Sequence, residues 1–391
     1  MKFMRAVVSV ACCLGVAAPS VHAQTPTRWN DFKDLFRTFV QHDSIVGASA
    51  LVMRDGKILD QLNLGFADRA NHIAVDSATL FHWGSITKGL TAISIMQLRD
   101  RGKLNLDERI VDYVPELRLV HDTFGSIDSV TIRMLLSHTA GFQNPTWPYG
   151  EGKDWEPFEP TTWAQLVAMM PYQEIHFKPG SRYSYSNPGF IYLARVIEKI
   201  TGDPWESYVQ KNIFAPLALT KSYFRATPYY LAAHRSHNYS VETDTATNRM
   251  SIVDHGADFD PGITIPNGGW NAPLSDLARY VSFLLKPEMA DVVFKPTTLA
   301  EMWQPVKPMS QGYQATADEW MGMSFFIHGT GDRRVLGHTG QQANFGSFFF
   351  FNPKTHVAVI AAYNTSNYDA AVLKENMEAK VVRAAIDLLR E

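Results

Sequence analysis

Apolar and polar residues alternate along two stretches near the beginning of the chain, residues 47–54 and 57–67, which are separated by Asp55-Gly56. Alternation with a period of two on either side of an Asp-Gly pair predicts a β-hairpin. The last third of the chain repeats this pattern in short runs separated by Gly, Asn and Pro, at residues 321–328, 333–337, 346–351 and 357–363. The helical spacing of apolar residues before the hairpin and after the last run predicts helices over residues 29–42 and 370–391.

The middle of the chain has the helical period instead. Helices are predicted over residues 84–101, 132–138, 190–200 and 274–285, and Gly102 ends the first of them. Strand-rich ends that flank a helical middle predict an α+β fold, in which one antiparallel sheet is built from both chain ends, is flanked by helices and carries an inserted, mostly helical domain. We expect the sheet domain to comprise residues 24–80 and 275–391 and the helical domain residues 81–274, with the active site between them.

Two long segments show no regular period. Residues 141–163 contain six aromatic side chains, which are typical either of a packed surface cover or of the wall of a substrate cleft. Residues 229–271 are rich in Asp, Asn and His and are predicted to be irregular.

The first 23 residues have the order of a secretory signal: Lys2 and Arg5, an apolar run, and Val-His-Ala ending at Ala23. Cleavage after Ala23 predicts a periplasmic or secreted protein. The only two cysteines, Cys12 and Cys13, lie in this leader, so the mature chain would have no disulfide and no cysteine-based metal site. Anchoring as a lipoprotein through Cys12 is the weaker alternative, because the residues before it are a poor match to such a site.

Composition narrows the classes of function. The 391 residues include 36 Lys and Arg against 39 Asp and Glu, and 46% are hydrophobic. This balance argues against a disordered chain and against nucleic acid as a partner. No apolar run after the leader approaches the ~18 residues of a membrane span, so stable membrane insertion is not expected. The sequence does not determine the oligomeric state.

Several well-known catalytic patterns are missing from the chain. No serine has glycine both two positions before and two positions after it, and no His-Glu-x-x-His is present among the 13 histidines. His234 and His237, three residues apart, are expected on a solvated loop. We therefore predict no metal and no cofactor.

Ser85 and Lys88 stand at the start of the first long helix. A spacing of three places both side chains on one face, one turn apart, so that the amine can reach the hydroxyl and activate it as a nucleophile. The same pair also occurs by chance in a chain of this length, as a helix cap and a surface lysine.

Two further motifs carry polar side chains of the same chemistry. Tyr185 and Asn187 precede Pro188. Tyr185 could act as a phenolate or as a proton shuttle. Asn187 could orient Lys88 and a substrate, or it could merely cap a helix. The run His338-Thr339-Gly340-Gln341 ends a strand-like stretch, and its small residues would let a substrate lie along the strand. A simple tight turn is the alternative for that run.

In this order, these three motifs resemble those of the serine β-lactamase and penicillin-binding-protein superfamily. The closest branch contains class C β-lactamases, D-Ala-D-Ala carboxypeptidases, D-aminopeptidases and family VIII esterases. The resemblance spans nearly all of the mature chain and includes residues 81–85, 135–141, 179–187, 268–279 and 337–353. It implies the β-lactamase/transpeptidase-like fold.

The resemblance also implies roles for single residues. Ser85 would be the acylated nucleophile, and Lys88 and Tyr185 would share the role of general base and later activate water. Asn187, His338, Thr339, Gly340 and Gln341 would bind the substrate, with the backbone N–H groups of Ser85 and Gln341 forming an oxyanion hole.

His338 departs from the class C pattern, which has lysine there. A histidine with a pKa near ~6.5 is mostly neutral at pH 7, so recognition of a substrate carboxylate should weaken. We therefore expect an exported serine hydrolase that cleaves esters or D-amino-acid amides of small-molecule or peptide substrates, with weak or no β-lactamase activity. The alternatives are a class C-type β-lactamase and a catalytically silent homologue that binds cell-wall material.

Overall fold

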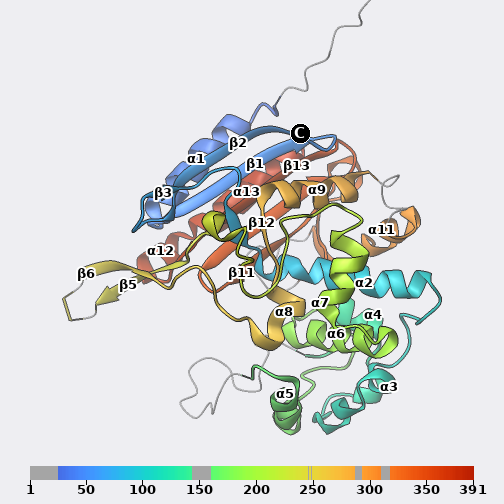
Figure 1. Ribbon diagram of the computed structural model, residues 1–391. Helices are drawn as coiled ribbons and strands as arrows, with labels where there is room; N and C mark the ends of the chain where they lie inside the picture. Colours follow the sequence, from blue (N-terminus) through green and yellow to red (C-terminus); the bar gives the residue numbers. More distant parts are fainter. Residues whose placement is uncertain (1–24, 143–159, 245, 248, 287–292, 310–317) are drawn as a thin grey trace, which may run out of the picture.

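The computed structural model describes residues 25–142, 160–244, 246, 247, 249–286, 293–309 and 318–391. Within this part of the chain, nine strands form one antiparallel sheet in the order β3-β2-β1-β13-β12-β11-β10-β9-β8 (Figure 1). The strands from the N-terminal end are β1 (Gly47–Arg54), β2 (Lys57–Asp68) and β3 (Ile73–Ala74). Those from the C-terminal third are β8 (Lys307–Pro308), β9 (Glu319–Met321), β10 (Phe326–His328), β11 (Val335–Gln342), β12 (Phe345–Asn352) and β13 (Val357–Tyr363).

The two ends of the chain meet where β1 pairs with β13. Ala48 lies opposite Tyr363 and Arg54 opposite Val357 in an unbroken antiparallel register. Both strands are buried almost throughout, so the pairing closes the centre of the sheet. This confirms the prediction of one antiparallel sheet built from both chain ends.

Each face of the sheet packs against helices. Alternate residues of β1 such as Ala50 and Val52 join a core with α1 (Trp29–His42) and α13 (Met377–Leu389), while Leu51 and Met53 point into the core on the other face. The second core is covered by α9 (Leu274–Leu285) and by the helical part of the molecule (Figure 1). The sheet is therefore the middle layer of three.

The helical part is built around α2 (Lys88–Asp100), which follows the 3₁₀ turn η1 (Gly84–Thr87), and α6 (Asn187–Thr201). Its other helices are α3 (Ile110–Tyr113), α4 (Ile132–Leu136), α5 (Trp163–Met169), α7 (Trp205–Val209), α8 (Ile265–Gly268) and α11 (Pro296–Met302). Of α2, eleven residues from Lys88 to Leu98 are buried, so it is a central helix and not an amphipathic surface one. None of the described helices is long and apolar enough to cross a bilayer.

Several element predictions are confirmed to the residue or nearly so, among them α1, the β1–β2 hairpin, β13 and α9. Other predictions are wrong. The run 321–328 is not one strand: it contains the last residue of β9 and all of β10, with residues 322–325 between them. Residues 239–254 form strands β5 (Tyr239–Asp244) and β6 (Arg249–Asp254) inside the segment predicted to be irregular. Most of β6 is exposed, so it lacks the apolar alternation that reveals a half-buried strand.

The C-terminal helix is also divided, into α12 (Ala370–Glu375) and α13, where one helix was predicted. Asn376 between them has a φ of 47°, and its side chain accepts a hydrogen bond of 3.1 Å from the Ala379 N–H. Asn tolerates this left-handed conformation and caps the second helix. The apolar spacing in the sequence continues across the break, which is why one helix was predicted.

The leader and most of the aromatic segment, residues 1–24 and 143–159, lie outside the described residues. Cleavage after Ala23 and both interpretations of the 141–163 segment therefore remain predictions. The boundaries between the sheet and helical domains remain a prediction as well.

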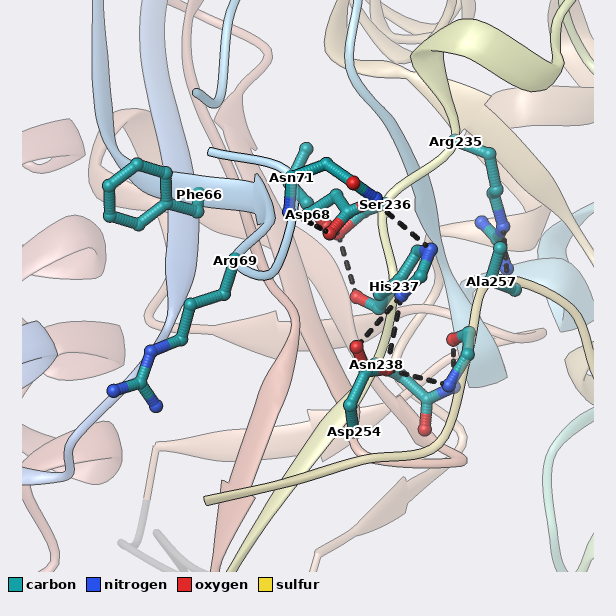
Figure 2. Close-up of polar contacts among 12 residues, drawn as sticks. Phe66, Asp68, Arg69, Asn71, Arg235, Ser236, His237, Asn238, Asp254 and Ala257 are labelled. Carbon is teal, nitrogen blue, oxygen red and sulfur yellow. Dashed lines mark hydrogen bonds and ion pairs between the residues drawn. The ribbon is translucent and has the colours of Figure 1, made fainter. Parts of the chain in front are cut away.

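His237 connects the β5–β6 hairpin to the end of β2 (Figure 2). Its Nε2 lies 3.6 Å from Asp68 Oδ2, and its Nδ1 lies 3.0 Å from Asp254 Oδ2. Atoms of these three side chains that could hold a metal ion all lie within 4.8 Å of one another. Each ring nitrogen faces a different carboxylate, however, which is the arrangement of an imidazole that bridges two acids. His237 thus lies on a loop, as predicted, but its side chain is only 27% exposed and bridges two carboxylates from different elements.

We expect His237→Ala to lower the free energy of unfolding by about 1 kcal/mol, because two carboxylates lose their shared partner. His234, exposed and three residues away, provides the matched control: His234→Ala should change stability by no more than ~0.5 kcal/mol. Chemical denaturation of both variants measures the difference. Equal stabilities would contradict the bridge, and a Tm that falls with a chelator and returns with Zn²⁺ would show a metal site instead.

Candidate active site

Ser85 lies where the start of α2 meets β11. Two glycines allow this approach. Gly84 has a φ of 50°, and a Cβ there would lie 2.7 Å from the Gln341 nitrogen. A Cβ on Gly340 would lie 2.0 Å from the Trp83 carbonyl oxygen. Any larger side chain at either position would push the serine away from the strand.

The edge of β11 beside Ser85 is free of strand partners among the described residues, because β10 pairs with β11 only at Val335, Leu336 and Gly337. On its other edge β11 pairs with β12 up to Gln342 and Phe345, which flank a two-residue turn. In a two-residue hairpin the flanking pair is hydrogen-bonded, and bonding then alternates along the strand. The N–H of Gln341 therefore points away from β12, toward η1.

The run from His338 to Gln341 is thus extended strand, which is the arrangement that lets a substrate lie along it, and the alternative of a tight turn is wrong. The turn comes later, at Ala343 and Asn344, which have φ values of 47° and 66°. The Gln341 N–H is one of the two donors of the oxyanion hole that the family resemblance implies, and that role remains a prediction.

Lys88 is fully buried, with no exposed surface. Its Nζ lies 3.0 Å from Ser85 Oγ and 3.0 Å from the carbonyl oxygen of Asn267, which accepts a hydrogen bond from it. No carboxylate pairs with Lys88 in the described part of the chain, and burial lowers the pKa of its ammonium group well below the usual value. A neutral amine at this distance can accept the serine proton.

Tyr185 reaches the same serine from the segment before α6. Its hydroxyl is hydrogen-bonded to Ser85, and its ring centroid lies 5.0 Å from Lys88 Nζ. Burial raises the pKa of the phenol, and the bond to Ser85 offsets only part of this effect. The structure therefore favours a neutral phenol that relays a proton over the phenolate that the sequence left open.

Asn187 is the first residue of α6, and its neighbour Ser186 provides the cap by accepting a hydrogen bond from Gly189 N–H. The interpretation of Asn187 as a mere helix cap is therefore wrong. Its Oδ1 accepts from Asn267 Nδ2 at 3.3 Å, and the Asn267 carbonyl is the partner of Lys88. Asn187 thus supports the segment that holds the amine.

His138 belongs to the site although no role was predicted for it. Its ring stacks on Tyr185 with centroids 4.4 Å apart, and its Nδ1 accepts a hydrogen bond from Ser186 N–H at 3.0 Å. Burial, then the nearby Lys88, lower the pKa of this imidazole well below its usual value. The ring is therefore neutral and positions Tyr185. Its place in the 135–141 stretch of the family resemblance was the available signal.

His338 flanks Tyr185 on another side, with ring centroids 6.2 Å apart, and stacks on Phe326. It is 2% exposed, and its Nδ1 lies 2.5 Å from the Thr339 carbonyl oxygen. Burial, then Lys88, lower the pKa of His338 to about 3. This pKa is lower than the ~6.5 that the sequence led us to expect. The His338 imidazole is therefore uncharged over a wider pH range than was predicted.

A family model described as Beta-lactamase matches residues 32–383. The chain belongs to the Beta-lactamase family. Among curated proteins it is similar to Protein flp of Staphylococcus aureus strain COL, with 24% identity over 90% of this chain and 67% of that protein. It is also similar to the putative penicillin-binding protein PbpX of Bacillus subtilis strain 168. That match has 30% identity and covers 46% of this chain and 41% of the other protein.

Solved structures show the same fold. The octameric penicillin-binding protein homologue from Pyrococcus abyssi superposes with a TM-score of 0.72 and 23% identity, covering 92% of this chain and 78% of the other. A D-stereospecific amidohydrolase from Streptomyces sp. superposes with a TM-score of 0.68 and 24% identity, covering 86% and 94%. These matches confirm the predicted β-lactamase/transpeptidase-like fold.

The buried amine predicts how acylation depends on pH. Because the pKa of Lys88 is lowered in the folded protein, the base is lost only as pH falls through that lowered value. The rate of Ser85 labelling by a fluorophosphonate should rise with pH, reach its plateau well below 10.5, and not decline where a phenol usually titrates. A midpoint at or above the usual lysine pKa would contradict the neutral amine.

Removal of the amine tests the same point. Lys88→Ala should slow the labelling by roughly 10²–10⁴-fold, since general-base assistance is lost. Lys103, exposed just beyond the far end of α2, gives the control Lys103→Ala, which should label at the parent rate. Equal rates for the two variants would remove Lys88 from the mechanism.

Proposed function

We propose that the protein is an exported serine hydrolase that forms an acyl-enzyme on Ser85 and cleaves esters or D-amino-acid amides. The observation that carries the proposal is the buried Lys88 amine, 3.0 Å from the Ser85 hydroxyl oxygen and without a carboxylate partner among the described residues. A buried lysine in that state is costly to keep for structure alone but is suited to proton transfer.

In the proposed reaction, Lys88 takes the Ser85 proton while Oγ forms a bond to the substrate carbonyl carbon. The N–H groups of Ser85 and Gln341 stabilise the negative charge on the carbonyl oxygen. The bond to the leaving group then breaks, and the proton passes from Lys88 through the Tyr185 hydroxyl to the leaving oxygen or nitrogen. A water molecule repeats these steps on the ester and releases the acid, which restores the Ser85 hydroxyl.

The substrate preference rests on the chemistry around His338. A buried, neutral imidazole offers no positive charge to a carboxylate on the substrate, which argues against an efficient β-lactamase. The structural likeness to a D-stereospecific amidohydrolase agrees with amide or ester cleavage. The likeness to penicillin-binding proteins keeps a class C-type β-lactamase and a silent cell-wall-binding homologue as the alternatives.

A covalent adduct is the direct test of the nucleophile. Incubation with a fluorophosphonate should add one stable mass per chain, as read by intact-protein mass spectrometry, and Ser85→Ala should abolish the addition. Ser94→Ala alters another buried serine, in the middle of α2, and this variant should retain the adduct. An unreactive parent protein that still binds cell-wall fragments saturably would favour the silent homologue.

Substrate preference is tested by comparing kcat/KM on a short-chain nitrophenyl ester, a D-Ala-D-Ala peptide and a chromogenic cephalosporin. We expect turnover of the ester and slow or no hydrolysis of the cephalosporin, because no cation at position 338 holds its carboxylate. A cephalosporin rate above the ester rate would refute the argument from His338.

A further inference from the structure

The N–H of Gln341, a proposed oxyanion donor, lies where β11 is paired along one edge. β10 pairs with β11 only as far as Gly337, so within the described part of the chain β12 alone pairs with Gln341. Gln341 is exposed and lies just before the turn between the two strands. Such a strand end can twist, which would change the direction of its N–H groups. Strand pairing alone therefore does not fix this donor.

A row of three residues crosses the sheet at this level. Gln341 of β11 lies opposite Gly346 of β12, and Gly346 lies opposite Tyr363 of β13. Residues directly opposite one another point to the same face of a sheet. This face packs against α13, because Tyr363 shares a core with Met377. A Cβ on Gly346 would lie 2.1 Å from the Tyr363 hydroxyl oxygen, so the glycine leaves room for the two outer side chains to approach each other.

Glu378, in the first turn of α13, links these two side chains. Its Oε1 accepts hydrogen bonds from the Tyr363 hydroxyl at 2.6 Å and from Gln341 Nε2 at 3.0 Å. Its Oε2 lies 2.9 Å from the same Nε2. Tyr363 is buried in the core, so it holds the carboxylate in place, and the carboxylate in turn holds the Gln341 amide. Hydrogen bonds to a carboxylate are stronger than those between neutral groups.

The next residue, Gln342, is held on the opposite face of the strand. Side chains alternate along a strand, so Gln342 points away from α13. Its Oε1 lies 3.0 Å from His82 Nε2, and its Nε2 donates a hydrogen bond of 2.9 Å to Thr264 Oγ1. Two consecutive side chains thus hold the end of β11 from both faces. Without the link to Glu378, the strand end would be held from one face only.

A small rotation here would matter at the nucleophile. Gly84 approaches the same peptide so closely that a Cβ there would lie 2.7 Å from the Gln341 nitrogen. A hydrogen bond weakens steeply when its donor turns away from the acceptor. Since the oxyanion forms only as the reaction proceeds, a misdirected N–H would raise the energy of the transition state more than that of the bound substrate.

We propose that Glu378 is a positioning residue for the reaction at Ser85, because it fixes, through the side chain of Gln341, the direction of the Gln341 backbone N–H. The inference rests on the proposed function, since an oxyanion forms only if Ser85 attacks a carbonyl group. Tyr363 orients the carboxylate and acts one contact further away. Glu378 acts through Gln341 and needs no contact with the substrate.

The test compares p-nitrophenyl acetate with the thionoacetate of the same leaving group, in which sulfur replaces the carbonyl oxygen. Sulfur is a weaker hydrogen-bond acceptor than oxygen, so the ester gains more from well-directed N–H groups. The parent protein should have the higher kcat/KM on the ester. In Glu378→Leu the ratio of the two values should fall about tenfold, which is part of the roughly 10²–10³-fold cost of losing a whole donor.

A double-mutant cycle shows whether Glu378 acts through Gln341. Gln341→Leu keeps the backbone N–H but removes the amide that Glu378 holds, and it should lower the ratio to a similar extent. In that background, adding Glu378→Leu should change the ratio by less than about twofold. Glu375→Leu, which removes an exposed carboxylate at the end of α12, is the matched control and should keep the parent ratio. Additive losses, or a parent ratio in Glu378→Leu, would overturn the proposal.

Hydrogen–deuterium exchange separates this proposal from the proposed function, because it needs no turnover. Peptides covering residues 338–345 should exchange faster in Glu378→Leu and in Gln341→Leu than in the parent protein or in Glu375→Leu. Because Gln341 is exposed, Gln341→Leu tests the same link should Glu378→Leu not fold. Ser85 labelling with unchanged exchange and an unchanged ratio in these variants would overturn this proposal alone. A parent protein that neither labels nor turns over the ester would reject the hydrolase, and with it any role of Glu378 in the reaction.

Discussion

The buried amine of Lys88 is the constraint on which the rest of the site depends. Its ammonium form would lie out of water with a serine hydroxyl and a backbone carbonyl as hydrogen-bonding partners. Desolvation of that charge is unfavourable, so burial lowers the pKa of the amine well below its usual value and favours the neutral form. The same burial that fixes the side chain therefore also supplies the base.

The neighbouring rings fit this state. His138 and His338 are buried near the amine, and burial is the main cause of the lowered pKa of each imidazole. Tyr185 lies against His138 and bonds to Ser85 as a phenol. The surroundings of the amine are thus apolar or neutral rings, which stabilise its uncharged form and hold the hydroxyl groups in place.

Gln341 links the start of α2 to the C-terminal helix. β11 contacts η1, and the side chain of Gln341 donates hydrogen bonds to Glu378 of α13. The backbone of Gln341 serves the proposed oxyanion hole, while its side chain is held by Glu378.

Sequence reasoning succeeded where the signal is local. The hairpin of β1 and β2 followed from alternation around Asp55-Gly56, and α9 from its apolar spacing. The three motifs at Ser85, Tyr185 and His338 identified the fold because the family keeps their order along the chain. Exposed strands such as β6, and the break at Asn376, carry no such local signal and were missed.

The sequence by itself thus determined the kind of residues available for chemistry and the elements that carry them. Only the tertiary structure decided their protonation, because the pKa of Lys88, Tyr185 or His338 depends on how much water surrounds it. It alone brought His138 to Tyr185 and Glu378 to Gln341, since these pairs are 47 and 37 residues apart along the chain. Contacts over such separations are set by how the sheet and helices pack, which no short stretch of sequence encodes.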